Sequence, residues 1–112
     1  LTRGTDRAAA ISKIAATEGA AMSAAARWMG RVAALGCVAC RNAARGKTPA
    51  QVHHLTGYPF RGIGQKAADA FVVPLCASCH VELHRGVESW ELANGKQVEL
   101  LAQTILDLAR SA

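Results

Sequence analysis

The chain has 112 residues and a net charge of +5 at pH 7; 51% of its residues are hydrophobic and only 4% are aromatic. This length suits one domain, and its shortage of large core side chains favours a metal site that stabilises the fold. No run of about 18 apolar residues without charge occurs, which excludes a membrane-spanning helix. The first residues carry charges and lack the apolar core of a signal peptide. We therefore expect a cytoplasmic protein with no membrane partner.

The positive charge is concentrated in one part of the chain. Residues 19–68 contain no acid and seven bases, whereas five of the eight acids follow residue 80. A basic half of this kind favours a polyanion such as DNA as partner. A merely solvated basic surface is the alternative.

The order of patterns predicts an α+β domain. Residues 1–21 are alanine-rich, and we expect them to be an extension of the domain at residues 22–112. Within the domain the elements expected are a helix at 24–35, a basic loop at 41–49, a strand at 50–55, a loop at 56–64, a strand at 70–75, and helices from 79 to near 86, at 89–95 and at 96–110.

Apolar spacing predicts which faces of the first and last helices are buried. Trp28, Val32 and Leu35 recur on one face of the first helix, and Gly36 can end it with a positive φ. The last helix is expected to bury a stripe made of Val98, Leu101, Ile105 and Leu108.

Two Cys-x-x-Cys pairs give the strongest chemical signal. Cys37 and Cys40 form the first pair and Cys76 and Cys79 the second, with no cysteine left over. Four thiolates can close a tetrahedral zinc site that has no open position, and such a site is structural. Four separate free thiols are the alternative.

The histidines predict a second site. His80 and His84 are four residues apart, so on a helix they project from one face and can share an ion. His53 and His54 are neighbours on a predicted strand, where they must face opposite sides. The predicted hairpin brings this strand beside the helix.

Together these residues resemble the HNH nuclease superfamily in its four-cysteine form. The run His53-His-Leu-Thr-Gly, followed by Pro74-Leu-Cys-Ala-Ser-Cys-His-Val-Glu-Leu-His84, is similar to the phage Ref recombination-enhancement nucleases. The similarity extends over roughly residues 28–110. It implies a ββα-metal (HNH/His-Me finger) core with a four-cysteine zinc site, flanked by N-terminal and C-terminal helices.

The resemblance also implies an activity and the role of each histidine. The chain is expected to be a metal-dependent endonuclease that hydrolyses DNA phosphodiester bonds in phage or prophage recombination, directed by a RecA filament. His53, His80 and His84 would hold the catalytic ion, and His54 would be the general base. Mg²⁺ or Mn²⁺ is the expected catalytic ion, although imidazoles also bind Zn²⁺ or Ni²⁺.

One position departs from the superfamily pattern. The asparagine that holds the hairpin loop should fall nine residues before His80, where this chain has Phe71. Asp69 or Gln65 is expected to brace the loop in its place.

Six basic residues are candidates for contacts with nucleic acid, and the chain is expected to act as a monomer. The aromatic residues of the 56–64 loop could stack on bases or could pack back over the hairpin. The six bases are Arg41, Arg45, Lys47, Arg61, Lys66 and Arg85.

Two other functions fit the same residues. A zinc-ribbon module that binds nucleic acid without cleaving it would need only the four cysteines. A thiol redox protein would need them free, but no βαβ pattern surrounds either pair.

Overall fold

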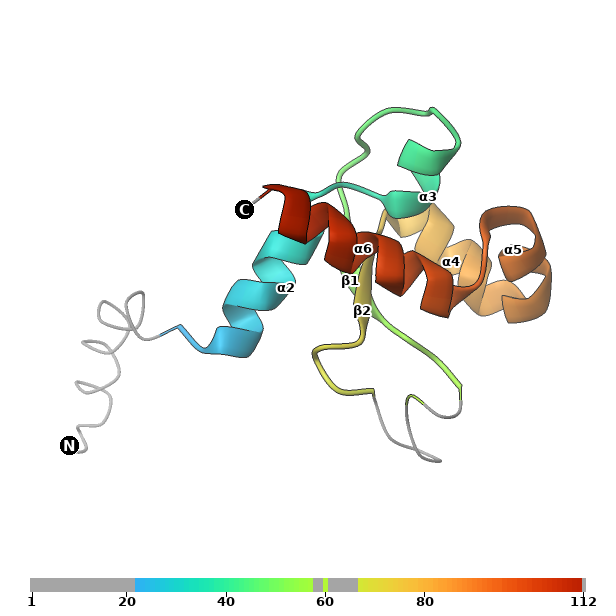
Figure 1. Ribbon diagram of the computed structural model, residues 1–112. Coiled ribbons are helices and arrows are strands. Elements are labelled where there is room, and N and C mark those ends of the chain that lie inside the picture. Colours follow the sequence, from blue (N-terminus) through green and yellow to red (C-terminus); the bar gives the residue numbers. More distant parts are fainter. Residues whose placement is uncertain (1–21, 58–59, 61–66, 112) are drawn as a thin grey trace.

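The computed structural model describes residues 22–57, 60 and 67–111, and the expected α+β class is confirmed (Figure 1). Helices surround a two-stranded sheet. The elements are α2 (Ala24–Ala34), α3 (Val38–Asn42), β1 (Gln51–His54), β2 (Val72–Leu75), α4 (Ala77–Arg85), α5 (Val87–Asn94) and α6 (Gln97–Ser111).

The hairpin is the centre of the fold. β1 and β2 run antiparallel, with His53 opposite Val73 and His54 opposite Val72. Pro74 lies within β2, where a two-stranded sheet leaves every strand an edge and so tolerates the missing N–H. All four residues of β2 are buried, because helices pack against it from several sides.

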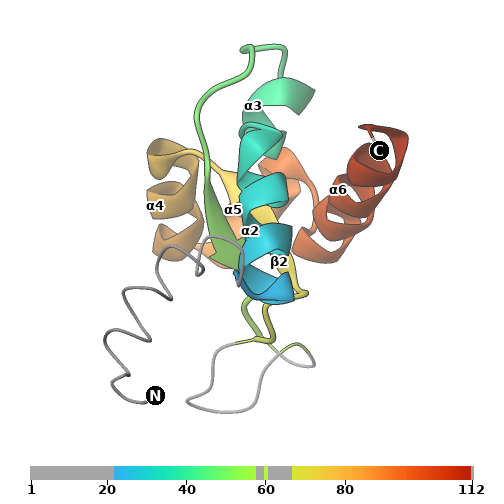
Figure 2. The ribbon, with the colours of Figure 1, turned by 90° about the vertical axis from the view of Figure 1, so that its left-hand side faces the viewer.

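Helices cover both sides of the hairpin. In Figure 1, α6 crosses in front of the strands, with α2 on the left and α4 and α5 on the right. After a quarter turn, the hairpin stands between α4 and α6 (Figure 2). The first residues of α4 follow directly from β2, so the chain order at the centre is strand, strand, helix.

The core consists of two clusters of buried side chains. The larger cluster contains all four cysteines, together with residues such as Leu55, Leu75 and Leu83. The smaller one lies under α2 and is formed by Val32, Val72 and Leu108. Because the cysteines lie inside the larger cluster, a bond or an ion that joins them would also stabilise the core.

The first helix agrees with its sequence pattern. Ser23 caps its N-terminus through its side-chain oxygen. Val32 is buried, and Trp28 and Leu35 pack against the same cluster. Gly36 has φ +84°, as expected of a residue that ends a helix with a positive φ.

The expected buried stripe of α6 is half wrong. Val98 and Ile105 are 47% and 46% exposed, whereas the other two members, Leu101 and Leu108, are buried. Gln97, Leu100 and Thr104 are buried instead. Gln97 and Thr104 are polar, and a face chosen by apolar residues alone misses them. Hydrogen bonds make their burial possible; the Thr104 hydroxyl, for example, donates to the carbonyl of Leu100 at 2.8 Å.

Several element boundaries also differ from expectation: β2 begins at Val72 rather than at residue 70, and α5 begins at Val87 rather than at residue 89. Arg41 and Asn42 were expected in a loop but form the end of α3, the short helix that the first cysteine pair begins. α4 starts two residues before Cys79, because Cys76 already caps it. Among the residues that the structure describes, no helix is long and apolar enough to cross a membrane.

Candidate metal centres

The two cysteine pairs are built alike. Cys37 caps α3 and Cys76 caps α4. In each pair the first sulfur accepts a hydrogen bond from the backbone N–H of the second cysteine, at 3.4 Å for Cys40 and 3.5 Å for Cys79. The sequence favours this geometry because the first N–H groups of a helix lack backbone acceptors.

The pairs meet as one group of four sulfur atoms. All four cysteines are buried and free of disulfides, and their Sγ atoms lie within 4.8 Å of one another. Four sulfurs at such distances match the donor set of a structural zinc site. These residues could therefore hold a metal ion such as zinc.

The electrostatics of this cage disfavour four thiolates in the absence of a cation. Burial raises the pKa of the Cys37 and Cys79 thiols, whereas a hydrogen bond with Thr48 lowers the pKa of Cys40 to about 6. The Arg45 guanidinium, 3.9 Å from Cys79 Sγ, adds positive charge beside the sulfurs. Four neighbouring thiols can all ionise only when a cation compensates them, and a zinc ion would do so.

A second group of donors consists of imidazoles. β1 supplies His53, and α4 supplies His80 and His84; one ring nitrogen of each lies within 4.8 Å of the others. The Nε2 atoms of His80 and His84 are 3.0 Å apart, and the ring centroids of His53 and His80 are 5.0 Å apart. His53 is buried, whereas His84 is exposed, so the group opens to solvent on one side.

The outer nitrogens of two of these rings contact glutamines. His53 Nε2 lies 2.9 Å from Gln97 Oε1, and His80 Nδ1 lies 2.8 Å from Gln51 Nε2. Burial lowers the pKa of His53 to about 4 and also lowers the pKa of His80. Both rings are therefore neutral at pH 7, which is the form that binds a metal.

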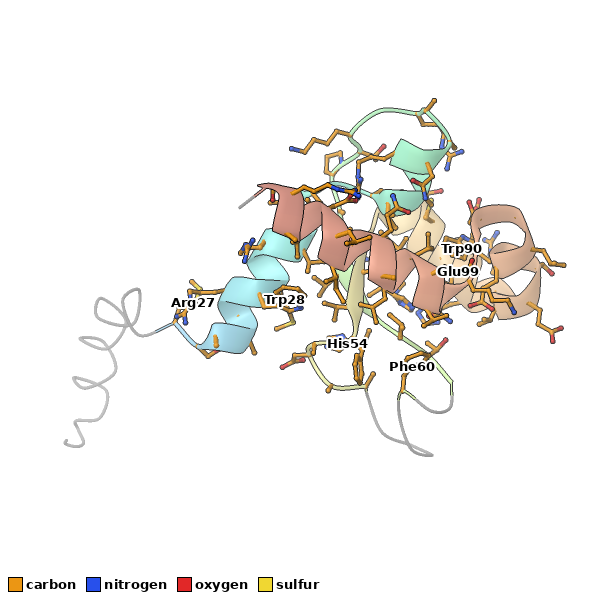
Figure 3. All side chains as sticks on the ribbon, in the orientation of Figure 1. Arg27, Trp28, His54, Phe60, Trp90 and Glu99 are labelled. Atoms are coloured by element: carbon orange, nitrogen blue, oxygen red, sulfur yellow. The ribbon has the colours of Figure 1, made fainter. Side chains whose placement is uncertain are left out.

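His54 lies on the other face of β1, as the alternation of a strand requires. Its Nε2 is 2.8 Å from Asp69 Oδ1, and the two side chains are 19% and 40% exposed. Figure 3 shows His54 at one end of the hairpin. Charge on His54 also acts to lower the pKa of His53, so the two imidazoles interact electrostatically.

The hairpin loop is held partly by backbone groups near Phe71. The Leu55 N–H donates to the Phe71 carbonyl and the Phe71 N–H to the Ala68 carbonyl, both at 2.9 Å. The Phe71 ring also packs edge-to-face on Phe60, with centroids 5.8 Å apart. Phe60 thus packs back over the hairpin. Asp69 contacts His54, and Gln65 lies outside the described residues.

Two of the six candidate basic residues contact groups of the protein itself. Arg41 is half-buried and forms an ion pair with Asp107 of α6, at 3.1 Å. Arg45 lies against the sulfur of Cys79. Both cations thus have partners inside the fold.

Of the other four bases, two lie in the described part of the chain and are exposed. Lys47 and Arg85 are exposed, the first beside Gly36 and the second at the end of α4. Arg61 and Lys66 lie outside the described residues.

Three side chains beside these histidines were missed as partners by sequence reasoning. Gln51 could have been found, because it lies two residues before His53 and so shares its strand face. Asp69 was considered only as a brace for the loop. Gln97 gave no signal, because a glutamine in the first turn of a helix is ordinary.

Comparisons with known proteins give a family but no activity. A family model described as "Protein of unknown function (DUF968)" matches residues 20–112. The "Uncharacterized protein YdfU" of Escherichia coli (strain K12) is 45% identical over 53 residues, which are 47% of this chain and 15% of that relative. The match therefore spans a small part of the relative's length. No solved structure matches the chain.

Proposed function

The chain belongs to the DUF968 family, and we propose that this member is a metal-dependent DNA endonuclease with an HNH-type ββα-metal core. The core would consist of β1, β2 and α4. α2, α3 and α6 would support it from outside.

The observation that carries this proposal is the presence of two separate donor sets. The four sulfurs need no further ligand, because four thiolates complete a tetrahedral zinc site. The three imidazoles are a different set, open to solvent at His84. A protein that needed only a structural zinc would not need this second set. Three imidazoles suit a divalent ion that retains a position for water or substrate.

The residues divide the chemistry as follows. His53, His80 and His84 would hold the ion, which when bound polarises a phosphate oxygen and stabilises the charge of the leaving oxygen. His54 would take a proton from the attacking water. Because Asp69 is a carboxylate, His54 Nε2 carries the proton of their 2.8 Å hydrogen bond, and Nδ1 is left as the basic atom.

Recruitment to DNA would come from basic residues of the chain and from a protein partner. Arg85 and Lys47 are exposed cations able to contact phosphates, and we propose the same role for Arg61 and Lys66. A domain of this size has little surface with which to read a base sequence, so a RecA filament on DNA is proposed to direct cutting.

A plasmid-cleavage assay tests the proposal. The wild-type chain, with Mg²⁺ or Mn²⁺, should nick or cut DNA either alone or on a RecA filament, and a chelator should stop it. His54→Ala should lower the rate by about 10² to 10⁴, the usual contribution of a general base. Circular dichroism and metal content should be unchanged. Asn42→Ala, on the exposed side of α3, is the matched control and should cleave as the wild type does.

Two results would reject the proposal. One bound metal per chain with no cleavage in either arm would favour the zinc-ribbon module. Full activity of His54→Ala would remove the assigned base.

A further inference from the structure

Gln97 is a buried polar residue whose side chain contacts one histidine of the imidazole group and Thr56, which follows β1. It begins α6, outside the strand and helix that carry the histidines, and it is 4% exposed. Its Oε1 lies 2.9 Å from His53 Nε2 and 3.1 Å from the Thr56 backbone nitrogen. Its Nε2 lies 2.9 Å from Thr56 Oγ1.

These contacts fix the orientation of the Gln97 amide. A backbone N–H can only donate, so the atom that faces the Thr56 nitrogen must be the oxygen of the amide. The Thr56 hydroxyl can then accept from the amide nitrogen. A flipped amide would place two N–H donors against each other, so the usual ambiguity of a glutamine does not arise here.

The orientation of Gln97 in turn fixes the tautomer of His53. Because the same oxygen faces His53 Nε2, that nitrogen must carry a hydrogen and donate it. In a neutral imidazole the other nitrogen, Nδ1, then holds the free lone pair. Nδ1 is therefore the atom that His53 can offer to an ion shared with His80 and His84.

The backbone of Gln97 is held as firmly as its side chain. Its N–H donates to Glu91 Oε2 at 2.8 Å, which ties the start of α6 to α5. Gln51 is different: it is exposed, and among the described residues its amide contacts His80 Nδ1. That amide can flip to suit either tautomer of His80, so it imposes none.

We propose that Gln97 is the positioning residue of the imidazole metal site, and that it presets His53 to bind through Nδ1. The C-terminal helix is thereby part of the site. This inference rests on the proposed function only in assigning a divalent ion to the three histidines. It adds a residue that fixes a ligand without touching the ion.

Metal titration of two matched variants tests the proposal. Gln97→Met and Gln103→Met make the same change on the same helix, but Gln103 bonds to Asn42 rather than to a histidine. Each protein is prepared with one equivalent of zinc and titrated with Co²⁺ by calorimetry. Loss of a residue that orients a histidine ligand typically weakens binding about 10- to 100-fold. We expect that loss in Gln97→Met and a change below about twofold in Gln103→Met, with the first zinc retained in both.

Two further measurements separate positioning from mere packing. ¹⁵N spectra of the imidazoles in the protein without Co²⁺ should show His53 as the Nε2–H tautomer in the wild type. Gln97→Glu keeps both acceptor contacts, so it should bind Co²⁺ at least as well as the wild type, and it remains informative if Gln97→Met fails to fold. An Nδ1–H tautomer, wild-type affinity in Gln97→Met, or equal weakening in Gln97→Glu would overturn the proposal. Co²⁺ bound as expected without DNA cleavage would reject the nuclease alone.

Discussion

At the scale of single residues, two neighbouring histidines have different surroundings because a strand alternates its side chains. His53 faces inward, is 2% exposed and meets His80 and His84. His54 faces the other way, is partly exposed and meets Asp69. One peptide bond thus separates a proposed ligand from a proposed base.

Asp69 gives the sharpest residue-scale prediction. In Asp69→Ala the His54 ring loses the acceptor of its Nε2–H, so either nitrogen can carry the proton and the ring can rotate. Because Asp69 acts through His54, kcat for DNA cleavage should fall at least about tenfold. The upper limit is about 10⁴, which is the fall in kcat when the carboxylate of a serine-protease triad is replaced. KM and the affinity for Co²⁺ should not change. Glu88→Ala, an exposed acid in α5, is the control, and a change in KM alone would contradict the assigned role.

The buried imidazole of His53 predicts how stability depends on pH. Burial lowers its pKa from 6.5 to about 4. Between these values the unfolded chain binds a proton on this ring and the folded chain does not, so the free energy of unfolding should fall as pH drops from about 6.5 to 4. Urea titrations of the zinc-loaded protein at pH 7 and pH 5, without a second ion, measure this. In His53→Gln the free energy of unfolding should depend less on pH. An equal change between pH 7 and pH 5 in the variant and the wild type would contradict the prediction.

At the scale of elements, each cysteine pair lies at the start of a helix and is also buried in the core. α3 and α4 each start at a cysteine whose sulfur accepts an N–H of the first turn. The chain reaches the first pair through Gly36, where a Cβ would lie 2.7 Å from Lys47 Cγ at a positive φ. Glycine is therefore required at the entry to the cage.

Cys76→Ser tests whether an ion or packing holds this cage. Serine is a good N-cap, so α4 should keep its cap while losing one sulfur ligand. If zinc binds there, the loss should exceed the stability of a small domain, since zinc contributes about 10 kcal/mol or more to folding in zinc-finger peptides. Thermal melting and zinc analysis should show an unfolded chain without the metal. A normal melting curve would count against a structural zinc. Ser78→Ala, exposed in the same turn, should behave like the wild type.

At the scale of the whole molecule, α6 connects the two proposed metal centres. Its first residue, Gln97, contacts His53. Further along, Gln103 bonds to Asn42 and Asp107 pairs with Arg41, both on the short helix of the first cysteine pair. A helix outside the strand–strand–helix unit therefore contacts both the imidazole group and the helix of the first cysteine pair.

The sequence predicts the candidate metal ligands better than it predicts the residues that contact and orient those ligands. Cysteine spacing, the i, i+4 histidines and strand alternation are local patterns, and the structure places those residues in two groups. The buried face of α6 was predicted only in part, because two of its residues, Gln97 and Thr104, are polar; Gln97 is buried against partners elsewhere in the fold. The contact of Gln97 with His53 spans 44 positions, and no local pattern encodes it.

One feature of α4 constrains how this protein can vary. Cys76 and Cys79 lie at its start, and His80 and His84 follow on the same helix. A helix turns by about 100° per residue. One residue inserted after Cys79 would leave the sulfur cage intact and swing both imidazoles away from His53. The number of residues between Cys79 and His80 therefore sets the angle about the helix axis between the two ligand sets.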